Sequence, residues 1–134
     1  MTAETDLSTL LNNLTPVASD ETYVFVSAEF ARLPVEVFQH AKGMFKEMEG
    51  TTFILEQQYA ESLGLSYEGR FCCITCEVHS SLEAVGMTAA MTTALGEAGI
   101  SANVVAAYFH DHIFVPADKV TQAINTLNAL SNQE

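Results

Sequence analysis

Hydrophobic and polar positions follow the most regular pattern in the second half of the chain. β-Rich residues predict a strand over 70–79, and an apolar stripe of helical period predicts a helix that ends near Ala98, before Gly99. A strand over 101–108, a tight turn and a returning strand over 112–115 come next. A last helix is predicted by its own apolar stripe. Its members are Val120, Ala123, Ile124, Leu127 and Leu130.

The first half repeats this alternation less clearly. Four leucines at helical spacing predict a short helix over 7–14, followed by a strand over 23–27. Residues 28–48 show no regular pattern, and a second strand is predicted over 52–55. A helix over 57–63 is expected to end at Gly64, the usual place for a left-handed glycine. Small isolated sheets bury too little surface, so we expect an α+β fold in which both halves share a sheet surface.

Composition narrows the class of partner. The chain has 134 residues, with 17 Asp and Glu against five Lys and Arg, and a formal net charge of −12. Because nucleic acids and anionic membranes are bound largely through Lys and Arg, neither partner is expected. The start of the chain has no apolar run, and the three cysteines form an odd, clustered set. These features predict a reduced, cytoplasmic protein.

The cysteine cluster offers the first candidate chemistry. Cys73 and Cys76 have the spacing of a redox pair or of half a zinc site. They lie in the predicted strand over 70–79, where successive side chains point to opposite faces, so the two thiols should point apart. No second cysteine pair completes a zinc site. The cysteines are therefore predicted to be core residues.

Two weaker catalytic hypotheses involve the histidines. His110 and His112 flank a predicted turn and could meet His79 around a metal ion in a metal-dependent enzyme. A hydrolase built from Ser80 or Ser81 with His110 and Asp111 lacks a strained nucleophile turn. Neither pattern is strong, so we expect no metal, no cofactor and no catalytic residue.

Gly86 is the most informative single position. Ser80 and Glu83 have capping-box spacing, which would start the helix before this glycine. A glycine inside a helix costs roughly 1 kcal/mol relative to alanine. One explanation is close packing of the helix on the sheet. The other is that the helix begins at Gly86 and Met87, where free backbone N–H groups would face a carboxylate.

Three segments resemble a known family. Residues 82–90, 98–106 and 110–116 are similar to ACT-domain proteins, above all to small bacterial proteins with two ACT-like units in tandem. The resemblance implies βαββαβ, ferredoxin-like units with an antiparallel sheet and helices on one face. It implies an N-terminal unit over 1–69, including the leading helix, and a C-terminal ACT domain over 70–134.

The resemblance also implies a function. ACT domains bind a free amino acid between two units, without catalysis, and a homodimer and an unidentified regulated protein are the expected partners. By position, the loop before the first helix and the start of the second strand supply the ligand contacts. The alternative is a protein–protein interaction module with no small ligand. The implied ligand-binding residues are Ser81, Val85, Gly86, Met87, Thr88, Asn103 and Val104.

Overall fold

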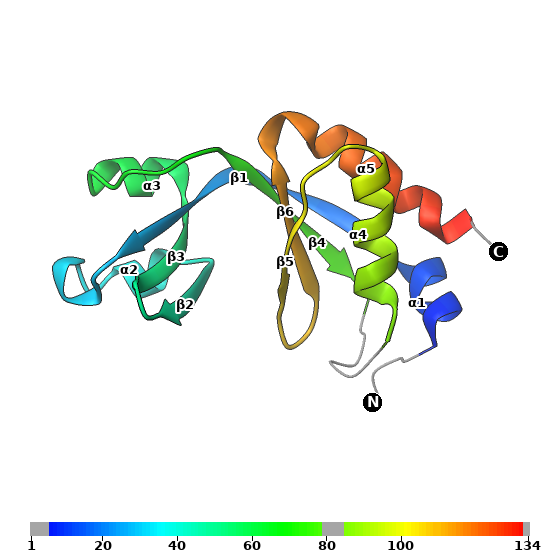
Figure 1. Ribbon diagram of the computed structural model, residues 1–134, viewed down its shortest axis with the longest axis horizontal. Coiled ribbons are helices and arrows are strands. Elements are labelled where there is room, and N and C mark those ends of the chain that lie inside the picture. Colours follow the sequence, from blue (N-terminus) through cyan, green and yellow to red (C-terminus); the bar gives the residue numbers. More distant parts are fainter. Residues whose placement is uncertain (1–5, 79–84, 133–134) are drawn as a thin grey trace. The chain divides into compact units, whose positions relative to one another are not determined.

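The structure, a computed structural model, describes residues 6–78 and 85–132 of the chain (Figure 1). The chain forms two compact units that do not follow one another simply along the sequence. Unit 1 combines Met1–Asp20 with Cys72–Glu134, and unit 2 is the intervening Glu21–Phe71. Unit 2 is therefore an insertion within unit 1, and strand β1 (Thr15–Ala28) contributes residues to both.

Unit 1 contains four strands and three α-helices among its described residues. The strand order is β1-β4-β6-β5, and β5 pairs antiparallel with β6, with Asn103 opposite Phe114. The part of β1 that belongs to this unit lies beside β4, where the Cys73 backbone N–H donates to Ser19 Oγ at 3.1 Å. The elements are α1 (Leu7–Asn13), β4 (Phe71–Glu77), α4 (Met87–Glu97), β5 (Asn103–Ala106), β6 (Asp111–Pro116) and α5 (Val120–Asn128), with the 3₁₀ turns η2 (Ala117–Lys119) and η3 (Ala129–Asn132).

The core of unit 1 lies between its sheet and its helices. Ile74 of β4 and Ile113 of β6 are fully buried against Met91 and Leu95 of α4. Leu127 of α5 belongs to the same core, so α4 and α5 cover the same face of the strands (Figure 1). The leading helix closes this core, because its Leu10 is also fully buried there, together with Leu14 just beyond the helix.

Unit 2 has a three-stranded sheet in the order β2-β3-β1. β3 pairs antiparallel with both neighbours, with Ile54 opposite Phe25 of β1 and Thr52 opposite Phe45 of β2. Its buried core is smaller than that of unit 1. The remaining elements are η1 (Phe30–Arg32), α2 (Val37–His40), β2 (Gly43–Glu47), β3 (Gly50–Glu56) and α3 (Gln57–Ser62), and the core residues are Val24, Val26, Val37, Phe53, Leu55 and Ala60.

The expected α+β class with an antiparallel sheet and flanking helices is confirmed. The spatial division differs from the expected boundary between 69 and 70, because residues up to Asp20 pack with the C-terminal unit. This happens because the apolar side of α1 packs against α4 and η3. Strand β2 was missed within the irregular 28–48 segment, since Met44 to Glu47 are all exposed and give no buried periodicity.

The helix over 57–63 is confirmed in position, with Gly64 in the left-handed region at φ +69°. The start of α4 is Met87, so the later of the two predicted helix starts is confirmed. Ser80 and Glu83 themselves lie outside the described residues.

No helix in the part of the chain that the structure describes is long and apolar enough to cross a membrane.

Candidate functional site

The candidate site lies at the N-terminus of α4, where Val85 and Thr88 are exposed. Gly86 is the N-cap residue, and its carbonyl accepts the first helical hydrogen bond from the Ala90 N–H at 2.9 Å. The N–H groups of the first turn have no partner within a helix, and the helix dipole gives this end a partial positive charge. Within residues 6–78 and 85–132 no side chain caps them, and the first turn carries no acidic residue. The geometry suits a small anionic group.

Helix α1 shows how this protein satisfies the same groups elsewhere. Its N-cap Asp6 accepts a hydrogen bond from the Thr9 N–H at 3.0 Å and another from Thr9 Oγ1 at 2.8 Å. The bond from the backbone N–H, followed by the hydroxyl bond, lowers the pKa of the Asp6 carboxyl below its ordinary value. Among the described residues, the chain therefore supplies a carboxylate to α1 and none to α4.

Gly86 is required by the local backbone. Its φ of +98° lies in the left-handed region, which side chains disfavour. A Cβ at this position would lie 3.2 Å from Leu7 Cδ2 of α1. The close neighbour of Gly86 is thus a helix, and the hypothesis of close helix-to-sheet packing was wrong. The Leu7 side chain therefore lies beside the start of α4.

The other predicted ligand residues differ in their surroundings. Val85 is 83% exposed beside the helix start, whereas the Met87 side chain is 3% exposed and belongs to the core. Thr88 is exposed at the second helical position. Ser81 lies outside the described residues. Of this loop, then, Val85 and Thr88 offer side chains to a ligand, while Met87 offers only its backbone.

Asn103 and Val104 begin β5, and residues 98–102 separate them from the end of α4. The Asn103 side-chain Nδ2 donates to the Phe114 carbonyl at 3.3 Å, which leaves its Oδ1 as an acceptor, and Val104 is partly buried against the core. β5 begins after the chain leaves the C-terminal end of α4 (Figure 1), and an 11-residue helix rises about 16 Å.

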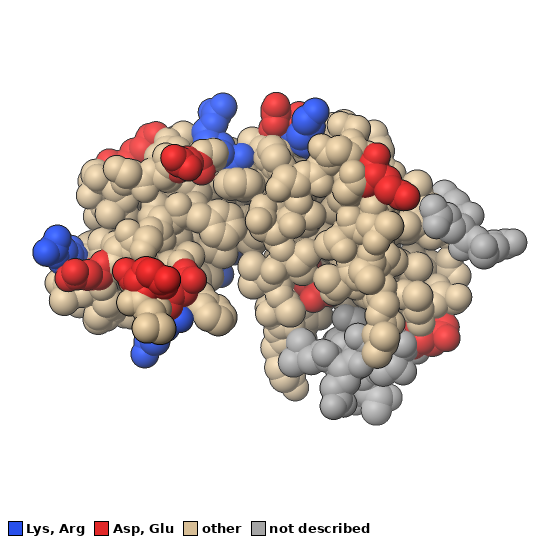
Figure 2. Space-filling model, viewed as in Figure 1, with Lys and Arg blue, Asp and Glu red and all other residues tan. Residues whose placement is uncertain are grey.

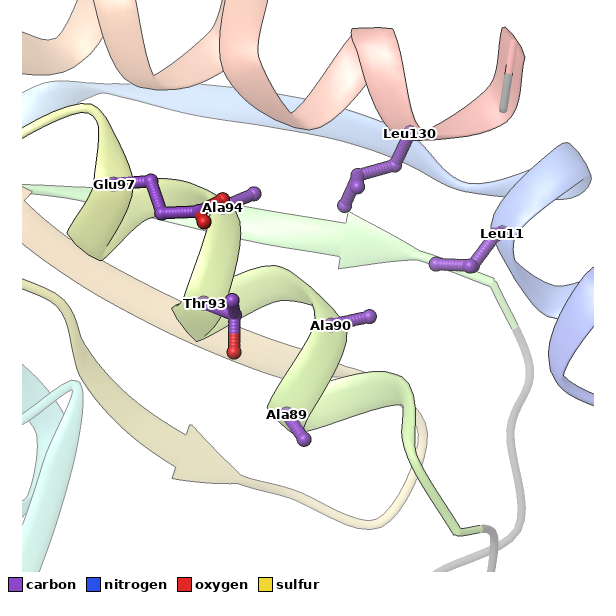
Figure 3. A pocket seen from close by; sticks show the side chains of 7 residues that line it. All are labelled: Leu11, Ala89, Ala90, Thr93, Ala94, Glu97 and Leu130. Atoms are coloured by element: carbon purple, nitrogen blue, oxygen red, sulfur yellow. The ribbon is translucent and has the colours of Figure 1, made fainter. Parts of the chain in front are cut away.

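A separate groove of about 340 Å³ runs along the outer side of α4 (Figure 3). Alanine and threonine side chains of α4 form its floor, with Leu11 of α1 and Leu130 of η3 on one side. Glu97 is its charged lining residue. A groove that carries a carboxylate and no cation does not suit an acid. The lining residues are Leu11, Ala89, Ala90, Thr93, Ala94, Glu97 and Leu130.

The strand cysteines have the predicted arrangement. Cys73 and Cys76 are free and buried, and they lie on opposite faces of β4. Cys76 packs in the helix-covered core, where burial, and then the charge of Asp111, raise the pKa of its thiol to about 12. Cys73 Sγ lies 3.9 Å from His112 Nδ1, which is 3.1 Å from Thr75 Oγ1. The pair is not a redox motif.

The metal and hydrolase hypotheses find no geometric support among the residues that the structure describes. Within 6–78 and 85–132, no three His, Cys, Asp or Glu side chains are placed to hold a metal ion. His79, Ser80 and Ser81 lie outside those ranges. Burial raises the pKa of the Asp111 carboxyl, against the opposing charge of His112. A raised pKa on a hairpin carboxyl is the expected effect of desolvation and does not by itself mark a catalytic group.

Basic and acidic side chains are interspersed on the surface. On the face shown in Figure 2, Lys and Arg side chains lie in small separate groups, with acidic side chains near most of them.

The sequence did not predict one feature of unit 2, an apolar pocket of about 260 Å³ that contains Lys46. A signal for it existed in the alternation of Met44 and Lys46, but the irregular segment around them concealed the strand.

Known structures resemble this fold. A Vibrio cholerae protein of unknown function, described as a possible transport protein, is 40% identical over 93% of this chain and 95% of its own, with a TM-score of 0.82. An Agrobacterium tumefaciens protein matches 88% of this chain and 89% of its own at 12% identity and a TM-score of 0.70. The regulatory subunit of aspartate kinase from Thermus flavus matches 87% of this chain and 97% of its own at 10% identity and a TM-score of 0.64.

Family models cover nearly the whole chain. One model of an ACT domain matches residues 2–73, and a second matches residues 68–129. No curated protein matches at a significant level. The first match alone spans more than half of the sequence, and the expected resemblance is confirmed. This chain therefore belongs to the ACT-domain family, whose domains are regulatory and sense ligands, and it has two such domains in tandem.

Proposed function

We propose that this protein senses a free amino acid and has no catalytic activity of its own. The observation that carries the proposal is the start of α4, which no side chain caps in the part of the chain that the structure describes. The backbone N–H groups at Gly86, Met87 and Thr88 would hold the ligand carboxylate. Val85, exposed beside them, would contact the ligand side chain.

The proposed site needs a second chain. Asn103 Oδ1 is an acceptor suited to an ammonium group, and with Val104 it would close the site from a partner copy. Support for this comes from the order of elements, since the whole of α4 separates Gly86 from Asn103 along the chain. The proposal therefore includes a homodimer whose two copies contribute complementary halves of each site. A cytoplasmic setting is part of it, and the three free cysteines are compatible with that setting.

An interaction module without a small ligand is the second candidate. Tyr108 and Phe109, at the β5–β6 hairpin, are 74% and 63% exposed, and Val85 is more exposed still. Exposed aromatic side chains of this kind are frequent at protein–protein interfaces. Under this alternative the regulated protein binds directly, and added amino acids change nothing.

Thermal unfolding with a panel of free amino acids separates the two candidates. A ligand that binds only the folded state stabilises it by about 2.7 kcal/mol at a hundredfold excess over its Kd. We expect a shift of several degrees with one or two amino acids. An absence of shifts, combined with recovery of one stoichiometric protein partner, would support the interaction module instead.

A complementation experiment tests the shared site. Thr88→Asp places a carboxylate where the ligand carboxylate would bind, and Asn103→Ala removes the acceptor from the other half. Each variant alone should bind no amino acid. An equal mixture should regain about a quarter of the sites, because half of the dimers are mixed and each of those has one intact site. Failure to regain any binding would contradict a site built from two copies.

A further inference from the structure

Unit 2 contains a pocket that the α4 site does not use. It has a volume of about 260 Å³ and lies between the irregular segment after β1 and the β2–β3 hairpin. Phe30, Phe38 and Met44 give it an apolar wall, while Lys46 and Thr51 add one ammonium and one hydroxyl. Ligand pockets typically combine an apolar lining with a few polar groups in this way.

The pocket exists because helix α2 is too short to cover the sheet. α2 has four residues, and only Val37 of it is buried. Phe38 therefore bridges the core and the surface, with its ring centroid 6.4 Å from that of buried Phe53 and 4.9 Å from that of Phe30. Phe30, Phe38 and Met44 stay close to half exposed. Burying these three side chains against a ligand would be favourable.

The two polar groups of the pocket lie together and are available. Met44 and Lys46 point to one face of β2, and Lys46 is opposite Thr51 of β3. Glu47 points to the other face, where its Oε1 accepts a hydrogen bond from Thr52 Oγ1 at 2.6 Å. Within residues 6–78 and 85–132, Lys46 Nζ forms no ion pair and Thr51 Oγ1 no hydrogen bond. The Lys46 ammonium is therefore available to pair with an anionic ligand.

We propose that this pocket binds a small carboxylic acid with an apolar body and no amine. The carboxylate would pair with Lys46 Nζ and accept from Thr51 Oγ1, and the apolar body would lie against Phe30, Phe38 and Met44. None of the lining residues is acidic, so the ammonium of an amino acid would be desolvated without a partner. This ligand class and this unit both differ from those of the proposed amino-acid site, and neither proposal depends on the other.

The pocket volume sets the size of the ligand. A water molecule in the liquid occupies about 30 Å³, so the pocket holds on the order of nine non-hydrogen atoms. Phenylacetate, with its single aromatic ring and one carboxylate, is a suitable probe. Phenylacetamide has the same shape without the charge, and L-phenylalanine adds one carbon that carries an ammonium. For so open a pocket we expect a Kd of about 1 mM for phenylacetate.

Titrating the full chain with these three probes, observed through the NMR signal of the Met44 methyl group, tests the proposal. Phenylacetate should shift this signal and bind more tightly than phenylacetamide or L-phenylalanine. Lys46→Gln should weaken phenylacetate binding about two- to fivefold, as expected for a partly exposed ion pair, and leave phenylacetamide binding unchanged. Lys42→Gln removes a lysine that lies over the Tyr23 ring outside the pocket and should change neither affinity.

Several results would overturn the proposal. Equal affinities for phenylacetate and phenylacetamide would remove the role of Lys46, and stronger binding of L-phenylalanine would remove the selectivity against amines. A phenylacetate effect that Thr88→Asp abolishes while Lys46→Gln does not would place the acid at α4. Because Thr88 lies in unit 1 and Lys46 in unit 2, the two variants also distinguish failure of this proposal from failure of the amino-acid site.

Discussion

The two units run through the same order of elements but differ at their first helix. In unit 1 this helix is α4, whose eleven residues bury Met87, Met91 and Leu95 and close the core. In unit 2 the same place holds a 3₁₀ turn and the four residues of α2, which leave aromatic side chains at the surface. The well-covered core of unit 1 leaves a helix end and a groove beside α4 at the surface, whereas the poorly covered core of unit 2 leaves an apolar pocket.

The units also differ in which segments of the chain contribute to their cores. The core of unit 1 receives Leu10 and Leu14 from the start of the chain, and β1 lies beside β4. Unit 2 is a continuous segment with a smaller buried core. Because fewer buried apolar contacts mean lower local stability, the backbone amides of β2 should exchange with solvent faster than those of β6.

The largest expected effect tests whether α1 belongs to unit 1. Leu10→Ala should lower the free energy of unfolding by about 2–5 kcal/mol, because the fully buried side chain leaves a cavity. Leu7→Ala, at a residue 37% exposed on the same helix, is the matched control and should cost clearly less. Urea unfolding measures both. Equal, small effects would mean that α1 is only an attached segment and not part of the core.

Alanine substitutions at two glycines, one before α4 and one inside it, should change the stability of the protein in opposite directions. Gly86→Ala should destabilise the protein by about 1–2 kcal/mol, because φ is +98° and the new Cβ would crowd Leu7. Gly96→Ala should stabilise it by roughly 0.5–1 kcal/mol, because Gly96 lies within the helix with open space around it. Thermal unfolding of the two variants measures both changes in stability. If both substitutions stabilise the protein, α4 begins before Gly86.

A smaller, pH-dependent effect is expected at Asp111. Burial raises the pKa of this carboxyl in the folded protein, so its charged form costs stability at neutral pH. Asp111→Asn should therefore raise the melting temperature at pH 7. The difference should shrink as the pH falls below the folded pKa and vanish below the ordinary pKa of 3.8, where the carboxyl is protonated in both the folded and the unfolded protein. An Asn variant that is less stable at pH 7 would show that the charge is stabilising, for instance through His112.

The sequence predicted unit 1 better than unit 2 for physical reasons. The stripes of α4 and α5 face a covered core, so each buried position recurs at helical spacing. β2 has no such signal, since Phe45 and Met48 beside it are exposed, and α2 is a single turn. The docking of α1 on unit 1 depends on contacts between residues about 80 positions apart, such as Leu7 and Gly86, which local periodicity does not encode.

The candidate site was predicted in part. The later start of α4 followed from the cost of a glycine inside a helix, and the structure confirms it. The side chain of Met87 was expected at the ligand but lies in the core, because it continues the apolar stripe of α4. The pocket at Lys46 was not foreseen, since it depends on how little of the sheet α2 covers.

The most direct test of the account compares Thr88→Asp with Thr88→Asn. A carboxylate in the first turn of α4 interacts favourably with the helix dipole, so Thr88→Asp should stabilise the protein by about 0.3–1 kcal/mol in the absence of ligand. The same carboxylate should compete with the ligand and abolish the stabilisation by the amino acid identified in the panel, while Thr88→Asn retains most of it. Unchanged amino-acid binding by a stabilised Thr88→Asp variant would contradict the assignment of the site to the start of α4.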